Sequence, residues 1–156
     1  MGNPGAGFKT TDSMILAYKS CKGSYTMLAD KFMTVYRWLE QRYIFPQHAF
    51  GIYYDDPAET PQYEQRSDVG FIIGFTTYGD EDITVETLPP RKVAYMVHKG
   101  PYGAISPSYE KLYRFIGDEG FSPAGSPMEI YLNDPDETPE DELLTEIQVP
   151  VKKFDY

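Results

Sequence analysis

Apolar residues follow two spacings along the chain, one typical of helices and one typical of strands. In two stretches they recur every three or four positions, as on one face of an amphipathic helix. The positions are Leu28, Phe32, Val35 and Leu39 in the first stretch, and Ile105, Tyr109, Leu112, Phe115 and Ile116 in the second. In the second stretch Ser106 is a good N-cap and Pro107 suits the first helical position. We therefore predict a helix around residues 28–39 and another over 104–118.

Elsewhere the apolar residues alternate with polar ones or form short β-branched runs, which is the pattern of strands. The segments with this pattern are 83–88, 92–98, 128–132 and 144–151 in the second half, and 50–54, 68–73 and a weaker 8–11 in the first. Turn signals such as Lys99-Gly100-Pro101 separate them. Strands grouped around single helices predict an α+β fold with antiparallel sheet.

The chain also repeats itself. Segment 50–61, which contains Tyr53-Tyr-Asp-Asp-Pro57, recurs as segment 128–139 at an offset of 78, and Cys21-Lys-Gly-Ser-Tyr25 recurs as His98-Lys-Gly-Pro-Tyr102 at an offset of 77. Five ordered matches of this kind exceed what chance gives. We predict a single domain over residues 1–156, built from two pseudo-twofold β-β-α-β-β repeats at about 8–78 and 83–153.

Alternation along the strands predicts which side chains point away from the helix. We expect Ile147, Val149, Val151, Ile130 and Leu132 to face the helix of the second repeat. The opposite face should then carry Glu129, Tyr131, Glu146 and Gln148 in the second repeat, and Tyr53, Asp68 and Gly70 in the first. Two such faces would form a ligand cleft between the repeats with one carboxylate from each. The alternative is that these faces lie open to solvent.

Charge narrows the range of partners. The 156 residues include 24 acids and 14 bases, a formal net charge of −10. This argues against nucleic acid as a direct partner, because phosphate binding needs a cationic face. No apolar run approaches the roughly 20 residues that span a bilayer, the N-terminus lacks a signal-peptide core, and a single cysteine fits a reducing compartment. We expect a cytoplasmic protein without membrane contact.

Several segments resemble the GyrI-like small-molecule-binding family, known also as the effector-binding domain of AraC-type and multidrug-responsive bacterial transcription activators. They are Val85-Glu-Thr-Leu-Pro-Pro-Arg-Lys-Val-Ala94, His98-Lys-Gly-Pro-Tyr102, Glu129-Ile-Tyr-Leu-Asn-Asp-Pro135, Leu144-Thr-Glu-Ile-Gln-Val-Pro-Val151 and, in the first half, Arg66-Ser-Asp-Val-Gly70. The resemblance implies two repeats around a ligand cleft, with Glu146 as the buried acid that holds amphipathic, often cationic aromatic compounds. We expect a stand-alone form, with no DNA-binding helix-turn-helix beside the repeats.

Binding of such cations, for sequestration or sensing of drugs and toxins, is the function that the sequence favours. Aromatic rings contribute about 0.5–2 kcal/mol for each good cation–π contact, and the acid supplies the opposite charge. The candidate ligand residues are Glu146, Tyr131, Tyr53, Asp68, Glu129 and Gln148, with Tyr102 and Tyr25 at the mouth of the cleft. Hydrogen-bonded or exposed structural acids are the alternative for Glu146 and Asp68.

Two other functions stay open. Some members of the family are hydrolases that open cyclopropane-bearing toxins, and here Glu146 would act as base and Tyr131 as donor without a metal. Other members inhibit DNA gyrase, which makes gyrase a weaker candidate partner. We expect no cofactor and no metal, because Cys21 and His98 are soft ligands in different repeats. We expect no Ser–His–acid triad either, since His48 and His98 lie beside no nucleophile motif.

Overall fold

The computed structural model describes residues 5–154, and the chain divides into two compact units. The central unit is Ser13–Pro89. The split unit combines the segment that ends at Asp12 with the segment that begins at Pro90. None of the helices in the described residues is long and apolar enough to cross a membrane.

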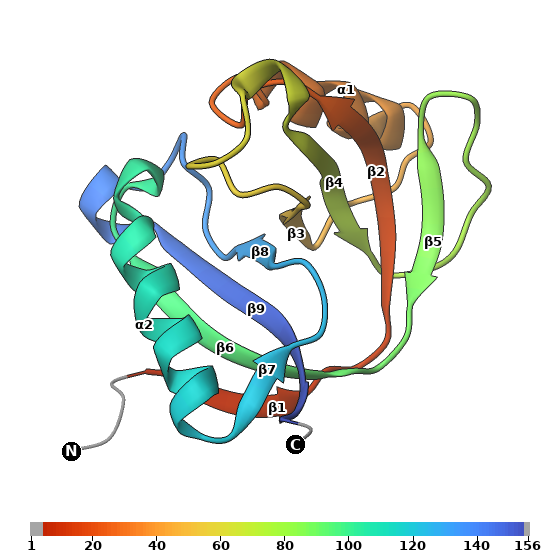
Figure 1. The fold of residues 1–156 in the computed structure, drawn as a ribbon. Coiled ribbons are helices and arrows are strands. Elements are labelled where there is room, and N and C mark those ends of the chain that lie inside the picture. Colours follow the sequence, from red (N-terminus) through yellow and green to blue (C-terminus); the bar gives the residue numbers. More distant parts are fainter. Residues whose placement is uncertain (1–4, 155–156) are drawn as a thin grey trace. The chain divides into compact units, whose positions relative to one another are not determined.

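The split unit is an antiparallel sheet covered on one face by a helix. Its strands lie in the order β1 (Gly7–Thr10), β6 (Lys92–Lys99), β9 (Leu144–Lys153) and β8 (Met128–Tyr131), and β7 (Phe121–Pro123) pairs with the end of β9. Helix α2 (Ser106–Asp118) lies along β6 and β9 (Figure 1). The core between helix and sheet contains Leu112, Phe115 and Ile116 of α2, Ala94 and Met96 of β6, and Ile147, Val149 and Val151 of β9.

The central unit has the same arrangement. Its strands lie in the order β5 (Thr84–Leu88), β2 (Met14–Lys22), β4 (Arg66–Ile73) and β3 (His48–Tyr53), all antiparallel, and helix α1 (Ala29–Glu40) packs on one face. The core contains Val35, Trp38 and Leu39 of α1 with Ala17, Ile44, Ile73 and Ile83. Single 3-10 turns occur at η1 (Gln62–Glu64), η2 (Tyr102–Ala104) and η3 (Glu140–Glu142).

In each unit, the strand at one edge of the sheet comes from the other half of the sequence. Strand β1 stands at the start of the chain but pairs with β6, and Thr11 continues this pairing by donating its N–H to the carbonyl of Arg91 at 2.9 Å. Strand β5 precedes β6 in the chain but pairs with β2. The compact units therefore do not coincide with the predicted sequence repeats, because alternation within a strand does not specify its partner.

The α+β class, the antiparallel pairing and both helices are confirmed. Helix α2 begins at Ser106, and Pro107 occupies its first turn, but the N-cap is Ile105 and no side chain caps the helix, so the prediction of Ser106 as N-cap is wrong. Strands β2 and β7 have no counterpart among the predicted segments. β7 is three residues long and ends in proline, which leaves too little pattern to recognise.

Candidate functional site: a buried carboxylate beneath helix α2

Strand pairing decides the side of the sheet on which each candidate residue lies. Directly paired residues of antiparallel strands project from the same face. Glu129 pairs with Ile147, and Tyr131 pairs with Thr145. Ile147 belongs to the core beneath α2. Glu129 and Tyr131 therefore lie on the face that α2 covers.

The other two candidates of this unit lie on the opposite face. Glu146 pairs with Ile130, and Gln148 pairs with Met128. The prediction that Ile130 faces the helix, and that Glu129 and Tyr131 share a face with Glu146, is wrong. β8 also buries apolar side chains on the face away from α2, where Met128 is fully buried and Ile130 is 7% exposed. Alternation alone therefore could not show which face is the helix side.

Two tyrosine hydroxyls hold Glu129. Tyr109 of α2 donates to Oε2 at 2.5 Å, and Tyr131 donates to Oε1 at 2.9 Å. Burial raises the pKa of Glu129, although both hydroxyls and the nearby His98 act to lower it. Among the salt bridges of the described residues, none reaches this carboxylate. Glu129 is therefore a buried carboxyl group that hydrogen-bonds to two tyrosines and, within residues 5–154, forms no salt bridge with a lysine or arginine.

Aromatic rings extend from this carboxylate in two directions. The ring of Tyr102 meets that of Tyr131 edge-on, with centroids 5.3 Å apart. The ring of Tyr109 stacks on that of Tyr113 at 6.2 Å. Burial raises the pKa of the Tyr102 hydroxyl, and the carboxylates of Asp134 and Glu129 add to this rise. A carboxylate beside several ring faces is suited to an aromatic cation.

Glu146, on the other face of the sheet, already has a cation. Nζ of Lys9 lies 2.7 Å from its Oε2, and Nε2 of Gln148 donates to the same oxygen at 2.6 Å. The Lys9 ammonium also lies 4.4 Å from the centroid of the Tyr95 ring. The hydrolase hypothesis requires Glu146 and Tyr131 to act on one bond, but these side chains project from opposite faces.

In the central unit, Asp68 lies on the face away from α1, as predicted. It pairs with Ser20, whose hydroxyl donates to Oδ1 at 2.6 Å, and the hydroxyl of Tyr54 donates to Oδ2 at 2.5 Å. Tyr18, on the same face, donates to Glu86 at 2.7 Å. Burial, with the adjacent carboxylate second, raises the pKa of both tyrosine hydroxyls well above the ordinary value. Gly70, also predicted here, pairs with Tyr18.

Tyr53 lies on the side of α1, so its predicted face is wrong. It pairs with Ser67 on the face that carries Val69 and Phe71. Its ring folds back over Gly51, where an added Cβ would overlap the tyrosine hydroxyl oxygen. At the predicted repeat offset of 78, Gly51 is the position equivalent to Glu129. The central unit therefore has a tyrosine ring where the split unit has a carboxylate.

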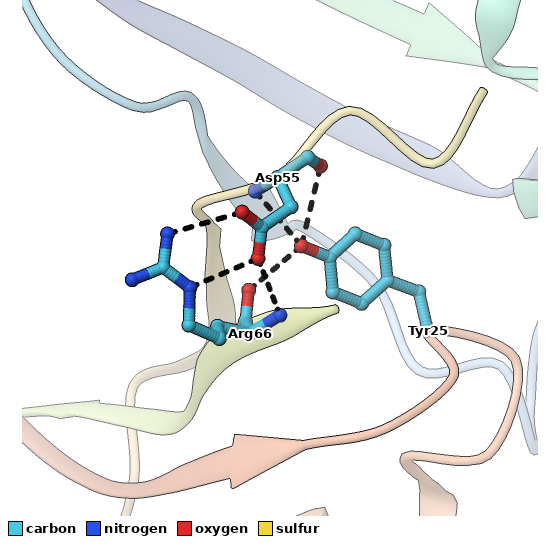
Figure 2. A network of polar contacts seen from close by, with 3 residues as sticks. All are labelled: Tyr25, Asp55 and Arg66. Carbon is cyan, nitrogen blue, oxygen red and sulfur yellow. Dashed lines mark hydrogen bonds and ion pairs between the residues drawn. The ribbon is translucent and has the colours of Figure 1, made fainter. Parts of the chain in front are cut away.

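Tyr25 closes a turn of the central unit (Figure 2). Its hydroxyl donates to the carbonyl of Arg66 at 2.7 Å and accepts from the backbone N–H of Asp55 at 3.1 Å. The guanidinium of Arg66 makes two hydrogen bonds to the Asp55 carboxylate, at 3.0 and 3.1 Å, which lower the pKa of that carboxyl. Through these contacts the Tyr25 hydroxyl joins the two ends of the turn between β3 and β4.

Three further polar residues of the site region were not among the predicted site residues. Tyr109 has the helical spacing of a core residue and does pack against the core. This spacing gives no sign that its hydroxyl bonds to Glu129. Lys9 aligns with Glu86 at the repeat offset of 77, a reversal of charge that is visible in the sequence. Ser108 lies against His98. Within residues 5–154 no three His, Cys, Asp or Glu side chains gather as a metal site would require.

Comparison with known proteins identifies the kind of domain. A family model described as the GyrI-like small molecule binding domain matches residues 7–152. The protein "DNA gyrase inhibitor 2" of Dickeya dadantii (strain 3937) is 29% identical over 114 residues, which cover 70% of this chain and 73% of that protein.

Solved structures share the fold. EcmrR in a complex with DNA matches with a TM-score of 0.83 at 20% identity, and the match covers 95% of this chain and 57% of the EcmrR chain. The isolated C-terminal domain of EcmrR matches with a TM-score of 0.77 at 20% identity, over 95% of this chain and 97% of the domain. SAV2435 bound to tetraphenylphosphonium matches with a TM-score of 0.63 at 15% identity, over 94% and 93% of the two chains.

Proposed function

Because the chain belongs to the GyrI-like small molecule binding domain family, we propose that it binds amphipathic aromatic cations with Glu129 as their counter-charge. The observation that carries the proposal is a buried carboxylate held by Tyr109 and Tyr131, to which no salt bridge of the described residues extends. SAV2435, of similar fold, was solved with tetraphenylphosphonium, a cation of this kind. Sequestration or sensing of drugs and toxins follows from such binding.

The energetics favour a cation over a neutral ligand. An ionised carboxylate loses solvation when it is buried, and an opposite charge nearby restores the charged form. The ring faces of Tyr102 and Tyr131 contribute about 0.5–2 kcal/mol for each good cation–π contact. Neither effect demands a strict ligand geometry. We therefore infer loose selectivity among bulky cations, with an affinity that falls when Glu129 is protonated.

Among the predicted ligand residues we assign Glu129, Tyr131 and Tyr102 to this site and add Tyr109. Glu146 contributes little attraction for a cation, because Lys9 neutralises it. We further infer that the two halves of the chain descend from one duplicated sequence, of which only the second copy carries this carboxylate. The glycine at position 51 supports this inference.

Charge selectivity tests the proposal. Tetraphenylphosphonium and tetraphenylborate have nearly the same shape and opposite charge. We expect isothermal titration calorimetry at neutral pH to give a dissociation constant at least about tenfold lower for the cation, a difference of about 1.4 kcal/mol. Equal affinity for the two ions, or binding of neither, would contradict the proposal.

A second candidate function rests on the likeness to DNA gyrase inhibitor 2. The acidic chain would dock on a basic surface of gyrase and lower its supercoiling activity. In a supercoiling assay we expect inhibition that increases with protein concentration and weakens as salt is raised. Full supercoiling activity at a large excess of the protein excludes this function.

A further inference from the structure

Ser108 and His98 form a hydrogen-bonded pair close to Glu129. Oγ of Ser108, on the first turn of α2, lies 2.9 Å from Nδ1 of His98 on β6. Nε2 of the same ring lies 3.0 Å from the carbonyl oxygen of Pro101. A carbonyl can only accept, so Nε2 carries the hydrogen of the neutral ring and donates it to Pro101. Nδ1 is then the acceptor, and the Ser108 hydroxyl donates to it.

This is the geometry in which a serine hydroxyl becomes a nucleophile. Activation requires a base within hydrogen-bond distance of the hydroxyl and a third group that orients the base. Here Nδ1 of His98 is the base and the Pro101 carbonyl orients the ring. His98 is 6% exposed, so packing also holds the imidazole in place, whereas Ser108 is only half-buried. The serine can therefore be reached from the surface.

A second hydroxyl, that of Thr145, lies beside the pair. Thr145 pairs directly with His98 across β6 and β9, so both side chains project from the face that α2 covers. Its side chain is fully buried, and its Oγ1 has no hydrogen-bond partner in the described part of the chain. A buried hydroxyl without a partner is costly. It is also a donor that is free to bond to a developing oxyanion.

The fold itself does not require these residues. At the repeat offset of 77, Cys21 stands in the place of His98 and Lys31 in the place of Ser108. The central unit packs its helix on its sheet without any such pair, so a merely structural role for the Ser108–His98 bond leaves its presence in one unit unexplained.

From this geometry we propose that Ser108 and His98 hydrolyse carboxylic esters of aromatic alcohols. Oγ of Ser108 bonds to the carbonyl carbon while Nδ1 of His98 takes the hydroxyl proton, and Thr145 donates to the carbonyl oxygen as it becomes negative. Breakage of the ester C–O bond releases the alcohol, which leaves with the proton from His98. Water then attacks the acyl-serine and gives its proton to His98. The carboxylic acid departs, and Ser108 recovers its proton.

The aromatic alcohol is chosen because of the neighbouring rings. Tyr131 pairs directly with Thr145, and Tyr102 meets the edge of Tyr131. An aryl leaving group can stack there while its ester carbonyl reaches Ser108. This activity does not require a cation at Glu129, although the two sites share the rings of Tyr102 and Tyr131.

Active-site labelling tests the proposal. The protein is incubated with a fluorophosphonate probe, intact mass and peptide mapping locate the adduct, and hydrolysis of p-nitrophenyl acetate is followed in parallel. We expect one adduct on Ser108, no adduct in Ser108→Ala, and labelling at least about tenfold slower in His98→Gln. Ser106→Ala, a change on the same turn of the same helix, should label at the wild-type rate.

Two labelling results would overturn the proposal. An unlabelled Ser108 in the wild-type protein, or an unchanged labelling rate in His98→Gln, overturns the proposal. If His98→Gln does not fold, the comparison of Ser108→Ala with Ser106→Ala decides alone. Tetraphenylphosphonium titration of Ser108→Ala keeps the two functions apart, because this variant should bind the cation normally while losing ester hydrolysis.

Discussion

Lys9 and Glu146 form an ion pair on the face of the split unit that points away from α2, with Nζ 2.7 Å from Oε2. They are 137 positions apart in the chain and meet because β1 and β9 flank β6. The pair gives Glu146 an internal counter-ion. Of the two carboxylates predicted as ligand residues in this unit, Glu129, on the opposite face, is the one that no salt bridge of the described residues reaches.

Removing the lysine charge should destabilise the protein. In Lys9→Met the partly buried Glu146 keeps its charge but loses its charged donor, which costs on the order of 1 kcal/mol of unfolding free energy for a pair with one exposed partner. Urea denaturation at neutral pH measures the loss. The double variant Lys9→Met with Glu146→Gln should regain most of it. A single variant as stable as wild type shows that the pair contributes nothing.

The buried carboxylate predicts a pH dependence of stability. The pKa of Glu129 in the folded state lies above its ordinary value of 4.5, so the folded protein holds this proton more tightly than the unfolded chain. Below pH 4.5 both states are protonated. As the pH rises from 4.5 through the raised pKa, the contribution of this group to the unfolding free energy is lost. Glu129→Gln does not titrate.

The variant therefore supplies the measurement. Urea midpoints of the wild type and of Glu129→Gln, compared between pH 4 and pH 8, should change relative to each other. The wild type should lose stability relative to the variant as the pH rises, and the difference should level off once Glu129 is ionised. A difference that is constant over this range, or that favours the wild type at high pH, contradicts a raised pKa.

Two glycines should respond to alanine in opposite ways. A Cβ on Gly70 would overlap the backbone carbonyl oxygen of Ala17 and come within 2.7 Å of the Cα of Tyr18. Because backbone cannot swing aside, Gly70→Ala should cost about 2 kcal/mol or more. Gly117, in α2, has open space around its Cβ position, so Gly117→Ala should stabilise by about 0.5–1 kcal/mol. Thermal unfolding of the two variants checks both signs.

Tyr43 carries a strained backbone after α1. Its φ is 59°, a conformation that costs a non-glycine residue roughly 1 kcal/mol. Its side chain is 90% exposed and gains little packing in return. The position that follows α2 at the same repeat offset is Gly120, with φ of 82°. Tyr43→Gly should therefore stabilise by about 1 kcal/mol, and Gly120→Ala should destabilise by a similar amount. Equal chemical denaturation midpoints for all three proteins would refute this.

The sequence predicted the elements better than their pairing. Both helices were visible because Leu112, Phe115 and Ile116 in one, and Val35 and Leu39 in the other, keep the helical spacing. The exchange of β1 and β5 between the units was not visible, since the alternation within an edge strand is the same whichever neighbour it joins.

The candidate site shows the same limit. The relevant types of residue were identified, a glutamate and tyrosines, but Glu129 was placed on the wrong face because Ile130 next to it is buried as well. The pairing of Glu129 with Ile147, which belongs to the core beneath α2, shows the face. The sequence could not show that Lys9 pairs with Glu146 either. The two side chains meet because β6 lies between β1, which carries Lys9, and β9, which carries Glu146.

Affinity for tetraphenylphosphonium in two matched variants tests whether Glu129 is the counter-charge for a bound cation. Glu129→Gln and Glu146→Gln make the same chemical change on opposite faces of one sheet, and calorimetry at neutral pH compares them with the wild type. We expect a dissociation constant at least about tenfold higher for Glu129→Gln, a loss of about 1.4 kcal/mol, and a change of less than about threefold for Glu146→Gln. Retained affinity in Glu129→Gln together with lost affinity in Glu146→Gln would contradict this role of Glu129.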